Sequence, residues 1–167
     1  MPGRRLLREP RRQAVHGVLP QMGAGGERRG IGGAAERRSE KNRGRPFVLF
    51  TAKDAQRCVE QTHEAGARGY ATDGPFLWRT GEGRLEGLWA GFSGNGYTEG
   101  IAISENGEID GRFRQLPPPF DRDGGHATVF NAFDGRIMMT LHSPSIHPLE
   151  RPRFVELREK DGYLCRA

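Results

Sequence analysis

The segment FLWRTGEGRLEGLWAGF, Phe76–Phe92, decides how this chain folds. Two apolar runs, FLWRT and RLEGLWAGF, flank a turn that contains Gly81 and Gly83. Aromatic and branched residues on both sides of a glycine turn are typical of a β-hairpin. We therefore predict two antiparallel strands in this segment.

Similar runs continue along the chain from Phe47 onward. They are short, apolar and separated by Gly, Asn and Asp, as antiparallel strands between turns are. The further runs are FVLF, YTEGIAIS, ATVFNAF, RIMMTLHS and RFVELRE. The sequence therefore predicts an all-β fold for this part of the chain.

The hairpin pattern also repeats. A shift of 52 positions places Gly83 on Gly135 and Leu85 on Ile137 without a gap. A strand, a glycine turn and a second strand that recur at about 50 residues are the signature of β-propeller blades. We interpret the two hairpins as parts of successive blades.

The same shift aligns Asp73-Gly74 with Gly125-His126. Because a propeller presents the starts of its innermost strands at one end of its channel, we expect Asp73 and His126 to lie close together. Local sequence leaves another interpretation open for each residue. Asp73 before Gly-Pro is also typical of a structural turn residue, and His126 of a histidine that caps a glycine turn.

Charge divides the chain into two unequal parts. Residues 1–46 hold 12 of the 26 Lys and Arg but 4 of the 21 Asp and Glu, a formal charge of +8, which leaves −3 for the remainder. The first part is rich in Arg and Gly, shows no helical or strand period, and has few side chains for a core. We predict that residues 1–45 are disordered and that residues 46–167 form the folded domain.

Several classes of function are not indicated. Cys58 and Cys165 lack partners at metal-ligand spacing, so we expect no metal and no cofactor. No apolar run approaches the ~18 residues of a membrane span, and no signal peptide is predicted in this chain. The glycines of Gly81–Gly87 do not have the spacing of a nucleotide-binding loop. The rings of Trp78, Trp89, Phe92 and Tyr97 are able to stack on sugar rings, but at strand spacing we expect most of them to pack in the core and at most one to contact a sugar.

Three segments carry a resemblance to a known family. They are TDGPFLWRTGEGRLEGLWAGFSGNGYTEGIAISENGEIDG, DGGHATVFNAFDGRIMMTLHSP and ERPRFVEL. In this order they resemble the C-terminal part of glycoside hydrolase family 43, over about Pro46 to Leu157. The family fold is a five-bladed β-propeller. The resemblance therefore implies a partial five-bladed propeller of about two blades plus an outer strand of a third.

The resemblance also implies roles for three residues. In the family a carboxylic acid in a (Glu or Asp)-Gly-Pro motif opens an inner strand and is the general acid, and Asp73 matches it, although Glu is the usual residue. A Gly-His pair opens the inner strand of a later blade at the channel centre, which implies that His126 binds substrate. Arg151, just before Pro152, is by the same analogy a sugar-contacting arginine.

The resemblance implies hydrolysis of arabinose- or xylose-containing glycans by inversion, with a carbohydrate as partner and no nucleic acid. Inverting enzymes need a protonated and an ionised carboxyl group about 6.5–9.5 Å apart. Family members carry the base and a further Asp on blades upstream of the acid, and this chain has no propeller sequence upstream of about Pro46. We therefore expect the chain alone to be inactive. The alternative is a non-catalytic, β-rich carbohydrate-binding module or a basic RNA-associated module.

Residues 1 to about 44 have a further interpretation, an out-of-frame translation. Back-translation of Gln13–Gly44 with the first base removed allows an apolar strand, a turn and a second alternating segment that run directly into Arg45. Codon degeneracy leaves most positions free, but the codons of Met22 and Gly23 force a shifted Trp. The shifted peptide also resembles the family's second-blade sequence. On this hypothesis the basic segment of residues 1 to about 44 has no evolved function.

The nucleotide sequence tests the frame hypothesis. We expect a single-base insertion or deletion near codon 44, with an open second frame that encodes strand-like sequence upstream of it. Synonymous codons that make the other frame nonsense would contradict the hypothesis.

Overall fold

The computed structural model describes residues 30–33, 47–62, 66 and 68–167. The segment predicted to be disordered and out of frame lies outside the described residues except for Gly30–Gly33, so both expectations stay predictions. Those four residues form β1, which pairs antiparallel with β2 (Phe47–Thr51). No helix in the described ranges is long and apolar enough to cross a membrane.

Two four-stranded antiparallel sheets account for most of the described chain. In each sheet the strands are neighbours in chain order, so each sheet is a simple meander. The first blade contains β5 (Thr72–Arg79), β6 (Leu85–Ser93), β7 (Gly96–Ser104) and β8 (Phe113–Phe120). The second blade contains β9 (Gly125–Asn131), β10 (Ile137–Ser143), β11 (Arg151–Lys160) and β12 (Tyr163–Arg166). The predicted all-β fold with two blades is confirmed.

Short elements connect β2 to the first blade. A 3₁₀ turn, η1 (Ala52–Asp54), follows β2 directly and is capped by the side chain of Asp54 on the Thr51 amide. The two-residue strands β3 (Gln61–Thr62) and β4 (Arg68–Gly69) pair with each other before β5 begins.

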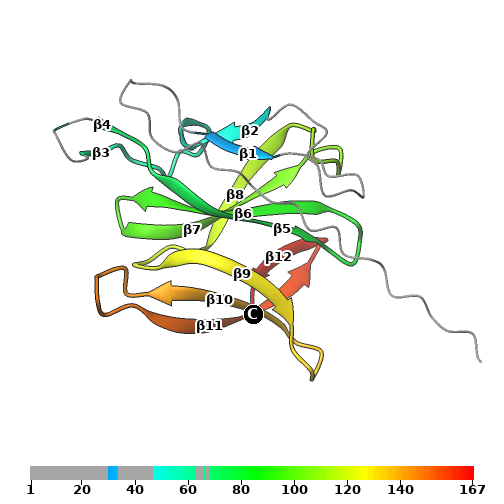
Figure 1. The fold of residues 1–167 in the computed structure, drawn as a ribbon. Coiled ribbons are helices and arrows are strands. Elements are labelled where there is room, and N and C mark those ends of the chain that lie inside the picture. The colour runs from blue at the N-terminus through cyan, green and yellow to red at the C-terminus, as the bar shows by residue number, and fades with distance from the viewer. Residues whose placement is uncertain (1–29, 34–46, 63–65, 67) are drawn as a thin grey trace, which may run out of the picture.

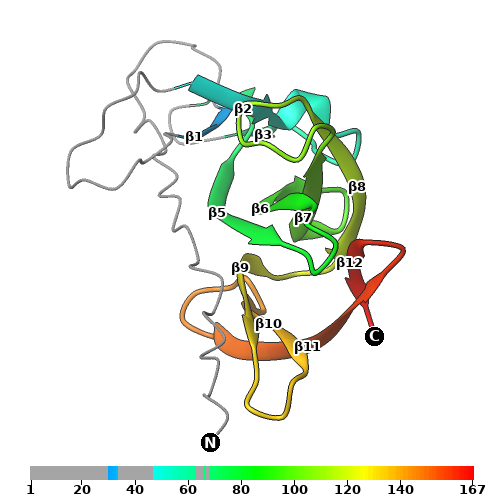
Figure 2. The same cartoon turned by 90° about the vertical axis from the view of Figure 1, so that its right-hand side faces the viewer.

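The sheets are stacked as layers. Figure 1 shows the β1–β2 pair, the first blade and the second blade one below the other. The first strands of the two blades, β5 and β9, lie against each other, and Figure 2 shows them adjacent from a second direction. Stacked meanders with adjacent first strands have the arrangement of neighbouring propeller blades.

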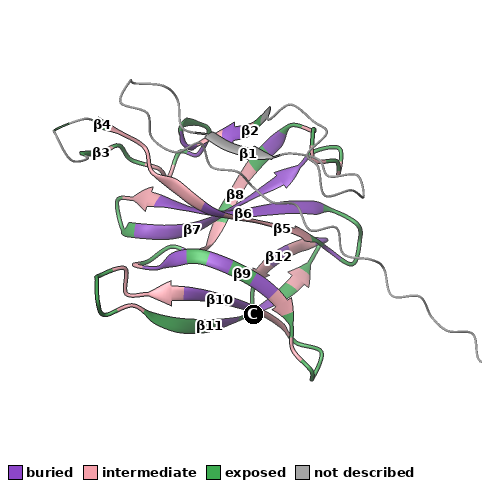
Figure 3. Cartoon of the chain, viewed as in Figure 1, coloured by how far each residue is buried: buried purple, intermediate pink, exposed green. Residues whose placement is uncertain are grey.

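The first blade is buried on both of its faces. Along β6, Leu88 packs on the second blade with Met139, whereas its neighbour Trp89 packs on the opposite side with Phe50 of β2. On β7, Ile101 belongs to the same interface as Leu88. Figure 3 shows β6 and β7 buried along most of their length. Burial on both faces explains why these strands are apolar at consecutive positions and do not alternate.

The second blade is buried mainly on one face. On β11, Val155 and Leu157 are buried against the first blade. Phe154 and Glu156, which alternate with them along the strand, are exposed. Phe154 keeps 60% of its surface exposed, and its ring lies edge-on to that of Phe130 on β9. The outward face of this blade therefore presents apolar side chains to solvent.

The inter-blade core predicts a stability difference between two matched truncations. Met139→Ala removes a fully buried side chain of the second blade, and we expect a loss of about 2–5 kcal/mol in the free energy of unfolding. Phe133→Ala, at a fully exposed position, should change it by less than about 0.5 kcal/mol. Urea denaturation followed by tryptophan fluorescence measures both.

Both tryptophans, Trp78 and Trp89, lie in the first blade, so their fluorescence reports on the blade that does not carry Met139. A lower midpoint for Met139→Ala therefore shows that the blades unfold together. An unchanged midpoint would contradict a shared core.

Candidate active site

The site begins at the turn that opens β5. Pairing of β5 with β6 is interrupted between Asp73 and Phe76, and Gly74 inside this interruption has a φ of 58°. A Cβ atom at Gly74 would lie 2.8 Å from the backbone Cα of His126. Only glycine combines a left-handed backbone with room for this close approach.

His126 occupies the corresponding place at the start of β9. It lies 52 positions after Gly74 and has a φ of 61°, which is uncommon for a residue with a side chain. The glycine before it is also required by packing, since a Cβ at Gly125 would lie 2.7 Å from the ring of Tyr97 and 2.9 Å from Ala90. The two blades therefore meet through equivalent left-handed turns.

The turns bring Asp73 and His126 together. The Nδ1 atom of His126 lies 3.8 Å from Oδ2 of Asp73, and the two side chains keep 61% and 42% of their surfaces exposed. A protonated imidazole at this distance forms an ion pair with the carboxylate. Because both groups remain open to solvent, a ligand can reach the carboxyl group of Asp73.

Tyr97 of β7 holds the other oxygen of Asp73. Its phenolic hydroxyl donates a hydrogen bond to Oδ1 of Asp73, while its ring is buried and packs against Phe92 and His142. Burial raises the pKa of the Tyr97 phenol well above its ordinary value, and the hydrogen bond to Asp73 raises it further. The phenol therefore stays a hydrogen-bond donor over the whole physiological range.

Glu99, two residues further along β7 than Tyr97, is a buried residue next to the turn that carries His126. It is fully buried, and its Oε2 atom accepts a hydrogen bond of 3.1 Å from the backbone N–H of Ala127, the residue after His126. Burial raises the pKa of the Glu99 carboxyl to about 8, although the Ala127 hydrogen bond acts in the opposite direction. The site thus contains a solvent-facing carboxyl group and a buried one.

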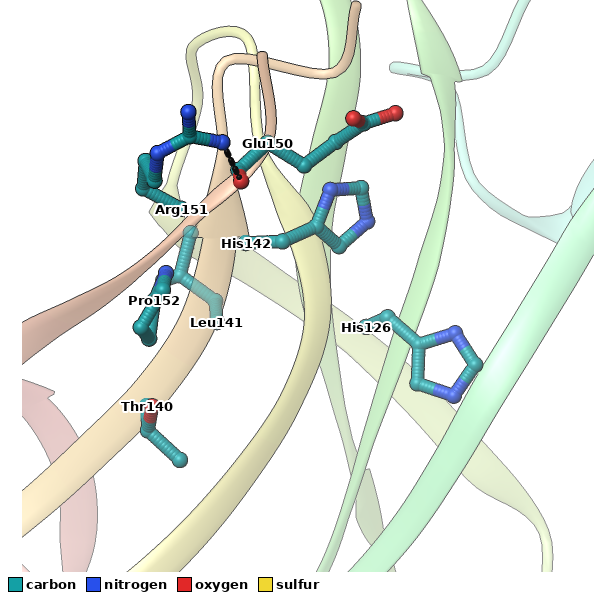
Figure 4. A pocket seen from close by; sticks show the side chains of 7 residues that line it. All are labelled: His126, Thr140, Leu141, His142, Glu150, Arg151 and Pro152. Atoms are coloured by element: carbon teal, nitrogen blue, oxygen red, sulfur yellow. Dashed lines mark hydrogen bonds between the residues drawn. The ribbon is translucent and has the colours of Figure 1, made fainter. Parts of the chain in front are cut away.

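A cavity of about 380 Å³ adjoins His126 on the second blade. It is lined by His126, by Thr140, Leu141 and His142 of β10, and by Glu150, Arg151 and Pro152 before and at the start of β11. Figure 4 shows Arg151 and His126 on opposite sides of the cavity. His126 therefore contacts both Asp73 and the cavity, while Asp73 does not line the cavity.

Two lining residues differ in how well their polar atoms are satisfied. Arg151 turns back onto its own loop, where Nη1 donates to the carbonyl oxygens of Pro148 and Glu150 at 3.2 and 2.8 Å. The Nδ1 atom of His142 is buried and has no partner among the described residues. Because this atom is closed to solvent, it is also closed to a ligand in the cavity, and Arg151 is the lining residue whose charge a ligand can meet.

None of the described side chains form a group of three or more His, Cys, Asp or Glu that could hold a metal ion. The chemistry that these residues can offer is proton transfer from or to Asp73, together with hydrogen bonds and charge from His126, His142 and Arg151.

Comparison with solved structures finds a similar fold in glycoside hydrolases. The chain is 33% identical to an endo-arabinase from Bacteroides thetaiotaomicron VPI-5482, with a TM-score of 0.71, and the match covers 80% of this chain and 48% of that protein. It also has the fold of a thermostable family-43 glycoside hydrolase, at 16% identity and a TM-score of 0.65, over 91% of this chain and 56% of that one. The chain resembles part of a family-43 glycoside hydrolase.

The extent of these matches is partial. The chain spans about half the length of the endo-arabinase and of the family-43 hydrolase that it matches. No protein-family profile matches the sequence, and no curated protein does. The family-43-like fragment is thus a partial β-propeller with a glycoside hydrolase-like fold.

Sequence reasoning missed three residues of this site. Tyr97 was one of four aromatic residues of which most were expected to be core; its ring is buried, and its hydroxyl reaches Asp73. Glu99 and His142 drew no prediction at all as site residues. The segment YTEG did carry a signal, because a Glu in an otherwise apolar, buried strand requires a specific partner.

The contact between the two turns predicts a difference between two glycine substitutions. Gly74→Ala and Gly83→Ala both force alanine into a left-handed backbone, but an added Cβ meets His126 only at Gly74, since nothing lies within 4 Å of one at Gly83. We expect Gly74→Ala to cost about 1–3 kcal/mol more than Gly83→Ala because of the added clash.

Urea denaturation of both variants measures this difference, and the NMR signal of the His126 ring should shift only in Gly74→Ala. Equal losses of stability, with the ring signal unmoved in both, would contradict the described contact.

Proposed function

We propose that this family-43-like fragment supplies the general acid and sugar-binding residues of a glycosidase active site that acts on arabinose- or xylose-containing glycans. The observation that carries the proposal is the convergence of Asp73 and His126 from equivalent turns of two blades, at a solvent-accessible position. Similarity at 33% identity to an endo-arabinase supports arabinose as the sugar.

In the proposed mechanism Asp73 is the general acid that protonates the leaving glycosidic oxygen. Tyr97 donates to one oxygen of the Asp73 carboxyl group, so the other oxygen, on the side of His126, is the one that faces substrate. His126 and Arg151 bind the sugar from the two sides of the cavity. Hydrogen bonds from such groups orient the sugar relative to the acid.

Inversion requires a second, ionised carboxyl group that activates water on the opposite face of the sugar. The buried Glu99 does not fit this role, because its side chain has no access to solvent. The family resemblance places the base on a blade upstream of the acid. We therefore propose that the 167-residue chain binds the sugar but does not hydrolyse it.

NMR titration of the chain with a linear arabino-oligosaccharide and with a xylo-oligosaccharide tests the proposal. We expect saturable shifts of the His126 ring and of the β10–β11 turn with at least one of the two sugars. Arg151→Ala should weaken binding about tenfold, the effect of losing one charge-assisted hydrogen bond. Arg158→Ala, an exposed arginine on the same strand, is the matched control and should leave binding unchanged.

Absence of saturable binding by either sugar, or equal effects of the two arginine variants, would contradict the proposed site. An aryl arabinoside and an aryl xyloside test the expected inactivity. Turnover that Asp73→Ala abolishes would show that the chain alone is an active enzyme. Binding of RNA that weakens steeply with salt would favour the alternative RNA-associated module.

A further inference from the structure

Two buried carboxyl groups of the first blade reach across to the second blade, at opposite ends of the interface. Glu99 accepts from the N–H of Ala127 at the start of β9, whereas Glu86 accepts from the N–H of Leu164 on β12 through both of its oxygens, at 3.3 and 3.2 Å. Both side chains are fully buried. Oε1 of Glu99 is buried without a hydrogen-bond partner among the described residues.

Glu99 lies at the level of the candidate active site. Strand pairing aligns Asp73 with Ala90 and Ala90 with Glu99, so Asp73 and Glu99 belong to one row across β5, β6 and β7. Tyr97, which donates to Asp73, precedes Glu99 by two residues on the same strand and therefore on the same face. Glu99 thus touches the turn that carries His126 and shares a sheet row with the acid.

We propose that Glu99 is a positioning residue: its buried carboxyl group holds the Gly125–Ala127 turn against the first blade and thereby fixes how closely His126 approaches Asp73. The turn needs such support, since His126 has a left-handed backbone that an amino acid with a side chain rarely adopts. The catalytic importance of this role rests on the proposed function, whereas the geometric part does not.

The charge on Glu99 provides a readout of its own. The charged or titratable groups around it are Asp73 on β5, Tyr97 on β7, His126 on β9 and Arg57 from the segment before β3. Because the pKa of Glu99 is about 8, the carboxyl group is mostly protonated at neutral pH and ionises in mildly alkaline solution. Ionisation adds a negative charge beside the Asp73–His126 pair, so the environment of the His126 ring should change near pH 8.

Stability alone cannot distinguish Glu99 from Glu86. Burial raises the pKa of both carboxyl groups above the ordinary value of 4.5, to about 8 and about 7. In both cases the folded chain retains the proton longer than the unfolded chain, so stability falls as pH rises from about 4.5 through the folded pKa. Replacement of either Glu by Gln should remove part of this fall. The His126 ring, in contrast, should respond only to Glu99.

NMR spectra of the full chain, recorded from pH 6 to pH 9.5, test the proposal with three variants. Glu99→Gln keeps an acceptor oxygen for Ala127, so the His126 and Ala127 signals should match the wild type at pH 7 but lose the transition near pH 8. Glu99→Ala removes the acceptor, and hydrogen exchange of the Ala127 amide should accelerate about tenfold or more. Glu86→Gln is the matched control: it replaces one of the two oxygens that accept from the Leu164 amide, so that amide signal should move while His126 stays unchanged.

Three results would overturn the proposal: a transition of His126 near pH 8 that persists in Glu99→Gln, unchanged Ala127 exchange in a folded Glu99→Ala variant, or an equal response of His126 to Glu86→Gln. If Glu99→Ala does not fold, the Glu99→Gln titration still decides the outcome. Titration of the same samples with arabino-oligosaccharide separates the two proposals. Loss of sugar binding with the Glu99 response intact contradicts the proposed function only.

Discussion

The whole arrangement depends on burial of a β-sheet on both faces at once. Leu88 and Trp89 are adjacent in sequence, so their side chains point to opposite sides of β6, and both are removed from water by different neighbours. A four-stranded blade that must satisfy two interfaces has little freedom to tilt or slide. This restriction fixes the distance between the first residues of β5 and β9, which carry the candidate site.

The site uses polar groups where the interface reaches the ends of the strands. Asp73 and His126 stay open to solvent, while Tyr97 and Glu99 are buried directly behind them. The buried groups form hydrogen bonds that the exposed groups cannot supply for each other at 3.8 Å. Placing polar groups behind a reactive carboxyl group is costly in a core unless each one is paired. The Tyr97 hydroxyl and one oxygen of Glu99 meet that requirement.

The sequence predicted the architecture well and the support of the site poorly. Strands with branched and aromatic residues were recognised because they alternate with glycine turns, and the repeat aligned Asp73-Gly74 with Gly125-His126. The edge strand β8 was missed because its three prolines, Pro117 to Pro119, argue against a strand anywhere except at a sheet edge. The short β12 was also missed, since four residues carry too little periodicity. Tyr97 and Glu99 could not be assigned because their partners are distant in sequence.

The equivalent turns also make each blade depend on the residue that the other carries at one position. Gly74 and His126 occupy the same place in a repeating unit, and both keep a left-handed backbone. The first turn has glycine, which this backbone favours, and the second carries an imidazole that occupies the space where a side chain at position 74 would lie. The two turns thus have complementary shapes at their contact. A larger side chain at position 74 would need a different residue at position 126, so a substitution at one position restricts what the other can be.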